Sequence, residues 1–99
     1  YGGNDNSTTR FRRYKGEYYG VADDKVKPLL KEYTDASHLL VPNQWYEIRI
    51  RVEKGITTYS VNDEELFRYT LAGSEGDGHF GLRLLQNHVL FTDFRATIL

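Results

Sequence analysis

A strict alternation of apolar and charged residues between Trp45 and Glu53 constrains the fold more than any other feature of this sequence. A period of two is that of a β-strand, because successive side chains of a strand point to opposite faces of the sheet. The pattern therefore predicts a strand with one face in the core and the other in a polar environment. The residues expected to face inward are Tyr46, Ile48, Ile50 and Val52.

Two more strands are predicted directly after this one. Lys54-Gly55 and Asn62-Asp63 have the composition of tight turns, and they bound the β-rich segments 56–61 and 65–69. Tyr59 and Val61 are expected to point inward. The three strands would form an antiparallel meander.

The rest of the chain beyond residue 70 continues this meander in the prediction. Three glycines make 71–78 a loop, and apolar alternation predicts strands over 79–85 and 89–99. The apolar parity changes within the last strand, so we expect a β-bulge near Thr92-Asp93.

The first 42 residues give a weaker strand pattern. Residues 8–14 and 17–21 are predicted to form a hairpin around Lys15-Gly16. Residues 22–42 are interpreted as a long connection with one short strand. A short helical turn over 29–33 is an alternative, whereas the prolines at 28 and 42 exclude a long helix.

Composition excludes several classes of protein. With 13 Lys and Arg against 14 Asp and Glu, the chain lacks the basic excess of a nucleic-acid-binding domain. No apolar run approaches the roughly 18 residues that a membrane span needs. There is no cysteine, and the aromatic share of 14% favours strands. Since the chain starts at Tyr1 and contains no Met, we expect an upstream segment to have been removed.

The predicted strand order carries a family resemblance. The segments 45–50, 59–66, 78–83 and 89–95 resemble the C-terminal half of a concanavalin A-like jelly roll. More narrowly, they are similar to domains of the Bacteroidetes glycosyl hydrolase and 3-keto-disaccharide hydrolase-like type. Residues 2–14 also resemble the central segment of one such subfamily.

This resemblance implies an all-β, antiparallel sandwich that acts on plant or microbial polysaccharide. It also implies a secreted, periplasmic or cell-surface protein. A complete sandwich of this kind has about 150 to 220 residues, so 99 residues would supply roughly its C-terminal half. An incomplete sandwich exposes strand edges and an apolar face. We therefore expect a second polypeptide fragment or a second copy of the chain to complete it.

An arginine-rich surface is the first candidate for sugar binding. Guanidinium groups bind carboxylates and hydroxyls through paired hydrogen bonds, which suits uronic acids. The structural alternative is a set of cross-strand ion pairs with Glu17 or Glu47. The predicted surface also includes Glu47 and Arg51 beside the residues expected to bind substrate. The residues predicted to bind substrate are Arg10, Arg12, Arg49, Gln86, Asn87 and His88.

Catalysis is predicted less specifically than binding. The candidates are Glu47, His88 and Tyr14, since a histidine titrates near neutral pH and hydrolases use carboxylates. Glu47 and Glu53 would lie about 20 Å apart along one strand, too far to act together. We favour a glycoside hydrolase or the sugar-binding module of one. A polysaccharide lyase that uses Arg, Tyr and His on uronates and a non-catalytic binding or assembly module stay open as alternatives.

Two further features have both a functional and a structural interpretation. No cofactor is expected, although the oxygen-rich segments 4–6 and 75–78 offer ligands for a structural Ca²⁺. Trp45 is either a platform for a sugar ring or a packing residue at the end of the sandwich, and we favour packing. His79 and His38 rank below His88 as functional histidines.

Overall fold

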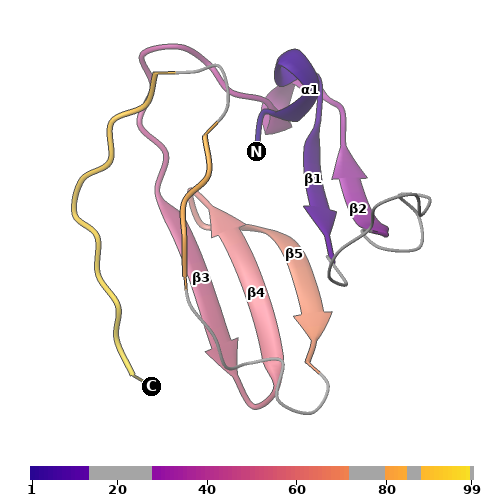
Figure 1. Ribbon diagram of the computed structural model, residues 1–99, viewed down its shortest axis with the longest axis vertical. Helices are drawn as coiled ribbons and strands as arrows, with labels where there is room; N and C mark the ends of the chain where they lie inside the picture. The colour runs from indigo at the N-terminus through magenta and orange to yellow at the C-terminus, as the bar shows by residue number, and fades with distance from the viewer. Residues whose placement is uncertain (14–27, 72–79, 85–87, 99) are drawn as a thin grey trace, which may run out of the picture.

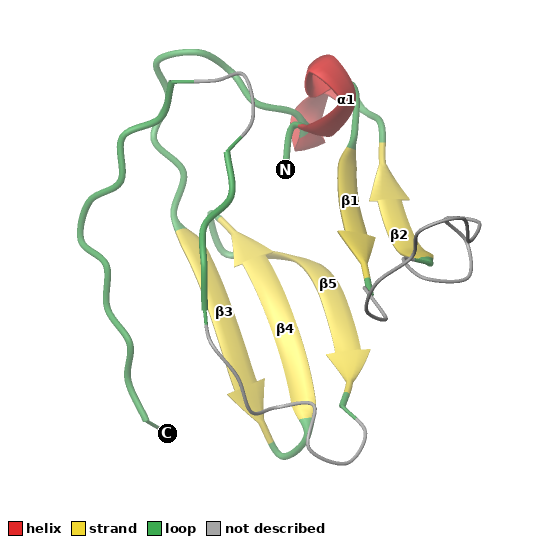
Figure 2. Ribbon diagram, viewed as in Figure 1, coloured by secondary structure: helices red, strands yellow, loops and turns green. Residues whose placement is uncertain are grey.

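The computed structural model describes residues 1–13, 28–71, 80–84 and 88–98. Within these ranges the regular secondary structure is mostly β-strand, in two antiparallel sheets (Figures 1 and 2). One sheet pairs β1 with β2, and the other has the order β3-β4-β5. The strands are β1 (Thr9–Arg12), β2 (Leu29–Tyr33), β3 (Ile48–Glu53), β4 (Ile56–Val61) and β5 (Glu64–Thr70). This architecture confirms the prediction of an all-β protein.

Two hairpins build the three-stranded sheet, as predicted. Lys54 (φ 50°) and Gly55 (φ 75°) join β3 to β4, and Asn62 (φ 50°) and Asp63 (φ 67°) join β4 to β5. Both loops have two residues with positive φ, which matches the right-handed twist of the flanking strands. Gly, Asn and Asp are the residues that adopt this conformation most readily.

Strand β3 begins at Ile48, three residues later than the predicted segment. Just before it, the Glu47 N–H donates to the Asn62 side-chain Oδ1 at 2.8 Å, and the Asn62 N–H donates to the Glu47 carbonyl at 2.9 Å. The turn residue Asn62 thus makes the hydrogen bonds to the Glu47 backbone that a residue of a neighbouring strand would otherwise make.

A β-bulge in β5 directs two consecutive side chains into the core. Tyr59 pairs with Phe67 and Ser60 with Glu65, so Leu66 is the extra residue. An inserted residue bends the strand and re-aims its side chain. Leu66 is consequently 1% exposed and Phe67 5% exposed, although neighbours in a regular strand face opposite sides.

The core lies where β1 and β2 meet β5. Val61, Leu66 and Phe67 are its buried residues. The Phe11 ring stacks on Phe67 with centroids 5.2 Å apart, and the Tyr33 ring lies 5.7 Å from Phe67. Aromatic contacts therefore hold the small sheet against the large one. The prediction that Tyr59 and Val61 face inward is confirmed, since Val61 is buried and Tyr59 is half-buried.

The short α1 (Gly3–Asn6) is a distorted turn rather than a regular helix. Asn4, Asp5 and Asn6 have φ values of 51°, 56° and 59°, which Asn and Asp tolerate better than most residues. The Asn6 amide donates to the Leu40 carbonyl and accepts from the Leu40 N–H, both at 2.8 Å. The turn therefore ties the N-terminus to the chain that follows the 3₁₀ turn η1 (Ala36–His38).

The strand partner of the N-terminal segment differs from the prediction. β1 pairs with β2, while the expected partner 17–21 lies outside the described residues. β2 is the one short strand predicted in the connection, and the helical turn over 29–33 was the wrong alternative. Pairing of Thr9 with Tyr33 places Phe11 and Tyr33 against the same core, a long-range contact that local pattern does not reveal.

The C-terminal strands predicted over 79–85 and 89–99 are wrong for the described residues. Residues 80–84 and 88–98 form no strand and have no ladder partner in the described ranges (Figure 2). Alternating sequence alone does not supply the neighbouring strand that a ladder requires. Asp93, where the bulge was expected, has φ 55° and breaks the extended backbone.

The prediction that the apolar side chains of β3 are buried is also wrong. Ile48, Ile50 and Val52 are 46%, 46% and 47% exposed, because no described element covers this side of the strand. Tyr46 is half-buried. Trp45 is 66% exposed, so the packing interpretation of this residue is wrong as well.

Candidate functional site

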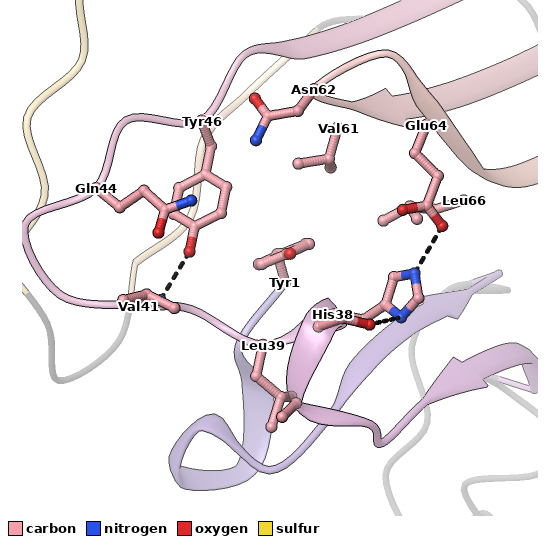
Figure 3. Close-up of a pocket in the computed structure, with 12 residues that line it drawn as sticks. Tyr1, His38, Leu39, Val41, Gln44, Tyr46, Val61, Asn62, Glu64 and Leu66 are labelled. Carbon is pink, nitrogen blue, oxygen red and sulfur yellow. Dashed lines mark hydrogen bonds and ion pairs between the residues drawn. The ribbon is translucent and has the colours of Figure 1, made fainter.

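A pocket of about 290 Å³ lies between η1, the segment that precedes β3, and the turn between β4 and β5 (Figure 3). Val61 and Leu66 of the core contribute apolar surface to it. Its polar and aromatic lining comes from Tyr1, Ser37, His38, Gln44, Tyr46, Asn62 and Glu64. The N-terminus, residues 36–46 and residues 61–66 therefore converge on one concave surface.

Two tyrosines form an aromatic wall of this pocket. The rings of Tyr1 and Tyr46 have centroids 5.6 Å apart and planes inclined by 52°. The Val41 N–H donates to the Tyr46 hydroxyl at 2.7 Å and fixes the ring across the pocket (Figure 3). Burial is the main cause that raises the pKa of the Tyr1 phenol, which keeps this hydroxyl neutral at physiological pH.

His38 bridges two carboxylates at the edge of the pocket. Its Nδ1 lies 2.6 Å from Oδ2 of Asp35, and its Nε2 lies 2.7 Å from Oε2 of Glu64. The Tyr33 ring stacks on the imidazole with centroids 4.1 Å apart, and the buried Thr9 hydroxyl donates to the His38 carbonyl. The ring is thus fixed through both its side chain and its backbone.

The electrostatics of this bridge favour a protonated imidazole. The hydrogen bond to Glu64, followed by that to Asp35, raises the pKa of His38 above 6.5. Hydrogen bonds from Ser37 and then His38 lower the pKa of Asp35 below 3.8. Both ring nitrogens donate only in the imidazolium form, so this form satisfies the contacts to Asp35 and Glu64 at the same time.

The described residues offer no metal centre built on these groups. No set of three or more His, Asp or Glu side chains in the described ranges is arranged to hold a metal ion. In the predicted calcium segment, both polar atoms of the Asn6 amide bind the backbone of Leu40. Residues 75–78, the other candidate, lie outside the described residues.

The comparison with protein families gives one match. The family described as Domain of unknown function (DUF6250) matches residues 1–94. The chain belongs to this family. The DUF6250 match includes every residue that lines the pocket. Neither a curated protein nor a solved structure matches the chain. No helix in the described part of this DUF6250 chain is long and apolar enough to cross a membrane.

Of the predicted substrate-binding residues, the four that the structure of this DUF6250 chain describes do not line the pocket: Arg10, Arg12, Arg49 and His88. Arg10 forms a cross-strand ion pair with Glu32. Arg49 lies on β3 with its guanidinium 3.2 Å from Glu47 and 3.9 Å from Asp63, and Arg12 lies on β1. An ion pair across strands was the structural alternative for the arginines, and Arg10 shows it with a different partner.

The catalytic candidates are not brought together either. Glu47 is exposed and pairs with Arg49 on its own strand segment, and His88 is exposed in the C-terminal segment. Tyr14, Gln86 and Asn87 lie outside the described residues. The structure therefore does not assemble the predicted arginine surface with the turn at 86–88 within the described ranges, and those assignments stay predictions.

Sequence reasoning missed the residues that the pocket of this DUF6250 chain does bring together. The spacing of Asp35 and His38 was the available signal, because three residues place two side chains on one side of a tight turn. Glu64 is 26 residues further along, and only the β3-β4-β5 hairpins bring it to His38. On sequence alone His38 ranks below His88, and the contact with Glu64 is absent from any local pattern.

Proposed function

We propose that this chain is a carbohydrate-recognition domain that binds a sugar ring in the pocket lined by Tyr1, Tyr46 and Glu64. The carrying observation is the combination of two aromatic rings, two amides and a carboxylate on one concave surface. A sugar ring has an apolar C–H face and a rim of hydroxyls. Aromatic rings cover the former, and amide and carboxylate groups bind the latter.

The arrangement of the carboxylates favours binding over hydrolysis. Glycoside hydrolysis generally needs two carboxyl groups that face the scissile bond, about 5 to 9.5 Å apart. Asp35 and Glu64 instead lie on opposite sides of the His38 ring, so the imidazole fills the space between them. This supports the non-catalytic alternative over the hydrolase.

The proposal also includes the fold and the location that the family resemblance implies. We propose that the two sheets are part of a concanavalin A-like sandwich in a secreted, periplasmic or cell-surface protein that meets polysaccharide. The exposed apolar side of β3 supports an incomplete sandwich, since a finished one would cover Ile48, Ile50 and Val52. Light scattering with intact mass tests this part. A monomer of 99 residues that shows cooperative unfolding would contradict it.

Sugar binding is tested directly by titration of the purified chain with neutral and acidic oligosaccharides. Trp45 is the single tryptophan and precedes Tyr46, so its fluorescence reports on the pocket, with calorimetry as the second measurement. Tyr46→Ala removes one aromatic wall and should weaken binding at least tenfold. Gln44→Ala changes an exposed lining residue without touching the core and should weaken it about threefold.

Arg49→Ala is the matched control, because Arg49 belongs to the arginine surface and lies outside the pocket lining. Its affinity for sugar should equal that of the wild type. If Arg49→Ala abolishes binding while Tyr46→Ala and Gln44→Ala keep it, the arginine surface is the site and the pocket is not. If no oligosaccharide binds the wild-type chain, the proposed function is wrong.

A further inference from the structure

We infer that the pocket selects neutral sugar rings and rejects uronates. This inference rests on the proposed function and adds the chemical class of the ligand. Among the described residues that line the pocket, the charged side chains are Glu64 and His38. The Tyr1 α-amine is a further ionisable group, and burial lowers its pKa, which favours its neutral form. The charge that a ligand meets is therefore set by these two side chains.

His38 does not serve as the cation for an acidic ligand. Each of its ring nitrogens already lies within 2.7 Å of a carboxylate oxygen, from Asp35 on one side and Glu64 on the other. The three groups together carry a net charge of about −1 when the imidazole is protonated. A uronate would enter next to this excess negative charge with no ring N–H left to bind it.

The arginines whose ion pairs the structure defines lie outside the pocket. Arg10 pairs with Glu32, Arg51 with Glu53 at 3.0 Å, and Arg68 with Glu65 at 2.8 Å. Recognition of a sugar carboxylate usually relies on a paired guanidinium contact, and a carboxylate that loses water without one is strongly disfavoured. The described lining thus lacks the group that an acidic glycan needs.

The groups that the pocket does offer match hydroxyls. The Oδ1 of Asn62 accepts from the Glu47 N–H, which orients the amide and leaves its NH₂ as the donor on the pocket side (Figure 3). On Glu64, Oε2 binds His38, so Oε1 is the acceptor that faces a ligand. Since a hydroxyl both donates and accepts, one vicinal pair on a neutral ring satisfies Asn62 and Glu64 together.

The experiment compares matched ligands that differ only at C6. Oligosaccharides of glucose, galactose and mannose are titrated into the purified chain beside the corresponding oligoglucuronate, oligogalacturonate and oligomannuronate. We expect the best-bound neutral series to bind at least tenfold tighter than its uronate counterpart. A uronate that binds as tightly as its neutral partner overturns the inference and leaves the proposed function standing. Absence of binding in every series overturns the proposed function itself.

Two variants test whether charge in the pocket is the cause of the selectivity. Gln44→Arg places a cation on an exposed lining position, and it should bring the uronate to within about threefold of the neutral sugar. Glu64→Gln removes the negative charge and should likewise reduce the preference for the neutral sugar over the uronate. Arg10→Ala, outside the pocket, should leave the ratio of the two affinities unchanged. If Arg10→Ala changes the ratio of the two affinities and the two pocket variants leave it unchanged, the selectivity arises outside the pocket and the inference is wrong.

Discussion

The Nε2 atom of His38 lies 2.7 Å from Oε2 of Glu64, although the two residues are 26 positions apart in the chain. His38 ends the 3₁₀ turn that follows β2, and Glu64 is the first residue of β5. The contact therefore links the small sheet to the large one at the edge of the pocket. The His38 side chain is only 14% exposed, so this link is partly shielded from water.

Removal of this link should lower stability without unfolding the protein. For His38→Ala we expect a loss of about 1 kcal/mol in the free energy of unfolding, because partly exposed ion pairs contribute little and the stacking on Tyr33 is also lost. Urea unfolding followed by circular dichroism measures it. His88→Ala is the control, since His88 is exposed, and it should change stability by less than about 0.5 kcal/mol. Equal effects of the two variants would show that the His38–Glu64 contact does not stabilise the fold.

The same bridge predicts a pH dependence of defined sign. The folded state raises the pKa of His38 above 6.5, so its contribution is fully present below pH 6.5 and is lost as pH rises through the higher folded value. The folded state lowers the pKa of Asp35 below 3.8, so that contribution is present above pH 3.8 and is lost as pH falls through the lower folded value.

The stability difference between the wild type and His38→Ala should therefore be largest between about pH 4 and 6.5 and should shrink as pH rises through the higher folded pKa of His38. Urea titrations of both proteins from pH 4 to pH 9 measure this difference directly. A difference that grows steadily toward alkaline pH would contradict the proposed direction of the His38 shift.

Burial differs sharply between the bulge in β5 and the apolar residues of β3, and substitution by alanine should reveal it. Leu66 is 1% exposed, so Leu66→Ala should cost about 3 kcal/mol through lost burial and a cavity. Ile50 is 46% exposed, so Ile50→Ala should cost less than about 1 kcal/mol. Thermal and urea unfolding compare the two. A cost for Ile50→Ala that approaches that of Leu66→Ala would mean that the β3 face is covered in solution, as it would be if a second copy of the chain completes the proposed sandwich.

Local sequence predicts the parts of this fold that depend on local interactions. The turns at Lys54-Gly55 and Asn62-Asp63 require positive φ, and their residue types reveal it, so β4 was predicted to the residue. The bulge that buries both Leu66 and Phe67 was not predicted, because consecutive apolar residues also occur in regular strands. Pairing between strands that are far apart in sequence, such as β1 and β2, cannot be predicted from a local residue pattern.

The candidate site was harder to predict for the same reason. Arginines and the turn at 86–88 stood out by residue type, whereas the pocket depends on side chains from η1, the segment before β3 and the β4–β5 turn. Asp35 and His38 are close in sequence, but their role as a bridge needs Glu64. Residue types alone predicted that polar side chains bind a ligand. Only the tertiary arrangement shows which polar side chains line the same pocket.

Gly2 has a positive φ and lies against the Leu40 side chain, which gives a last test of the N-terminal turn. Its φ is 72°, and a Cβ built there would lie 2.5 Å from Cδ1 of Leu40. Gly55 also has positive φ, 75°, but an added Cβ would meet nothing within 4 Å. Gly55→Ala should therefore cost about 1 kcal/mol from backbone strain alone, and Gly2→Ala about 1 kcal/mol more, because Leu40 must also move. Unfolding of the two variants in urea separates these effects, and equal costs would show that Leu40 does not pack against the N-terminal turn.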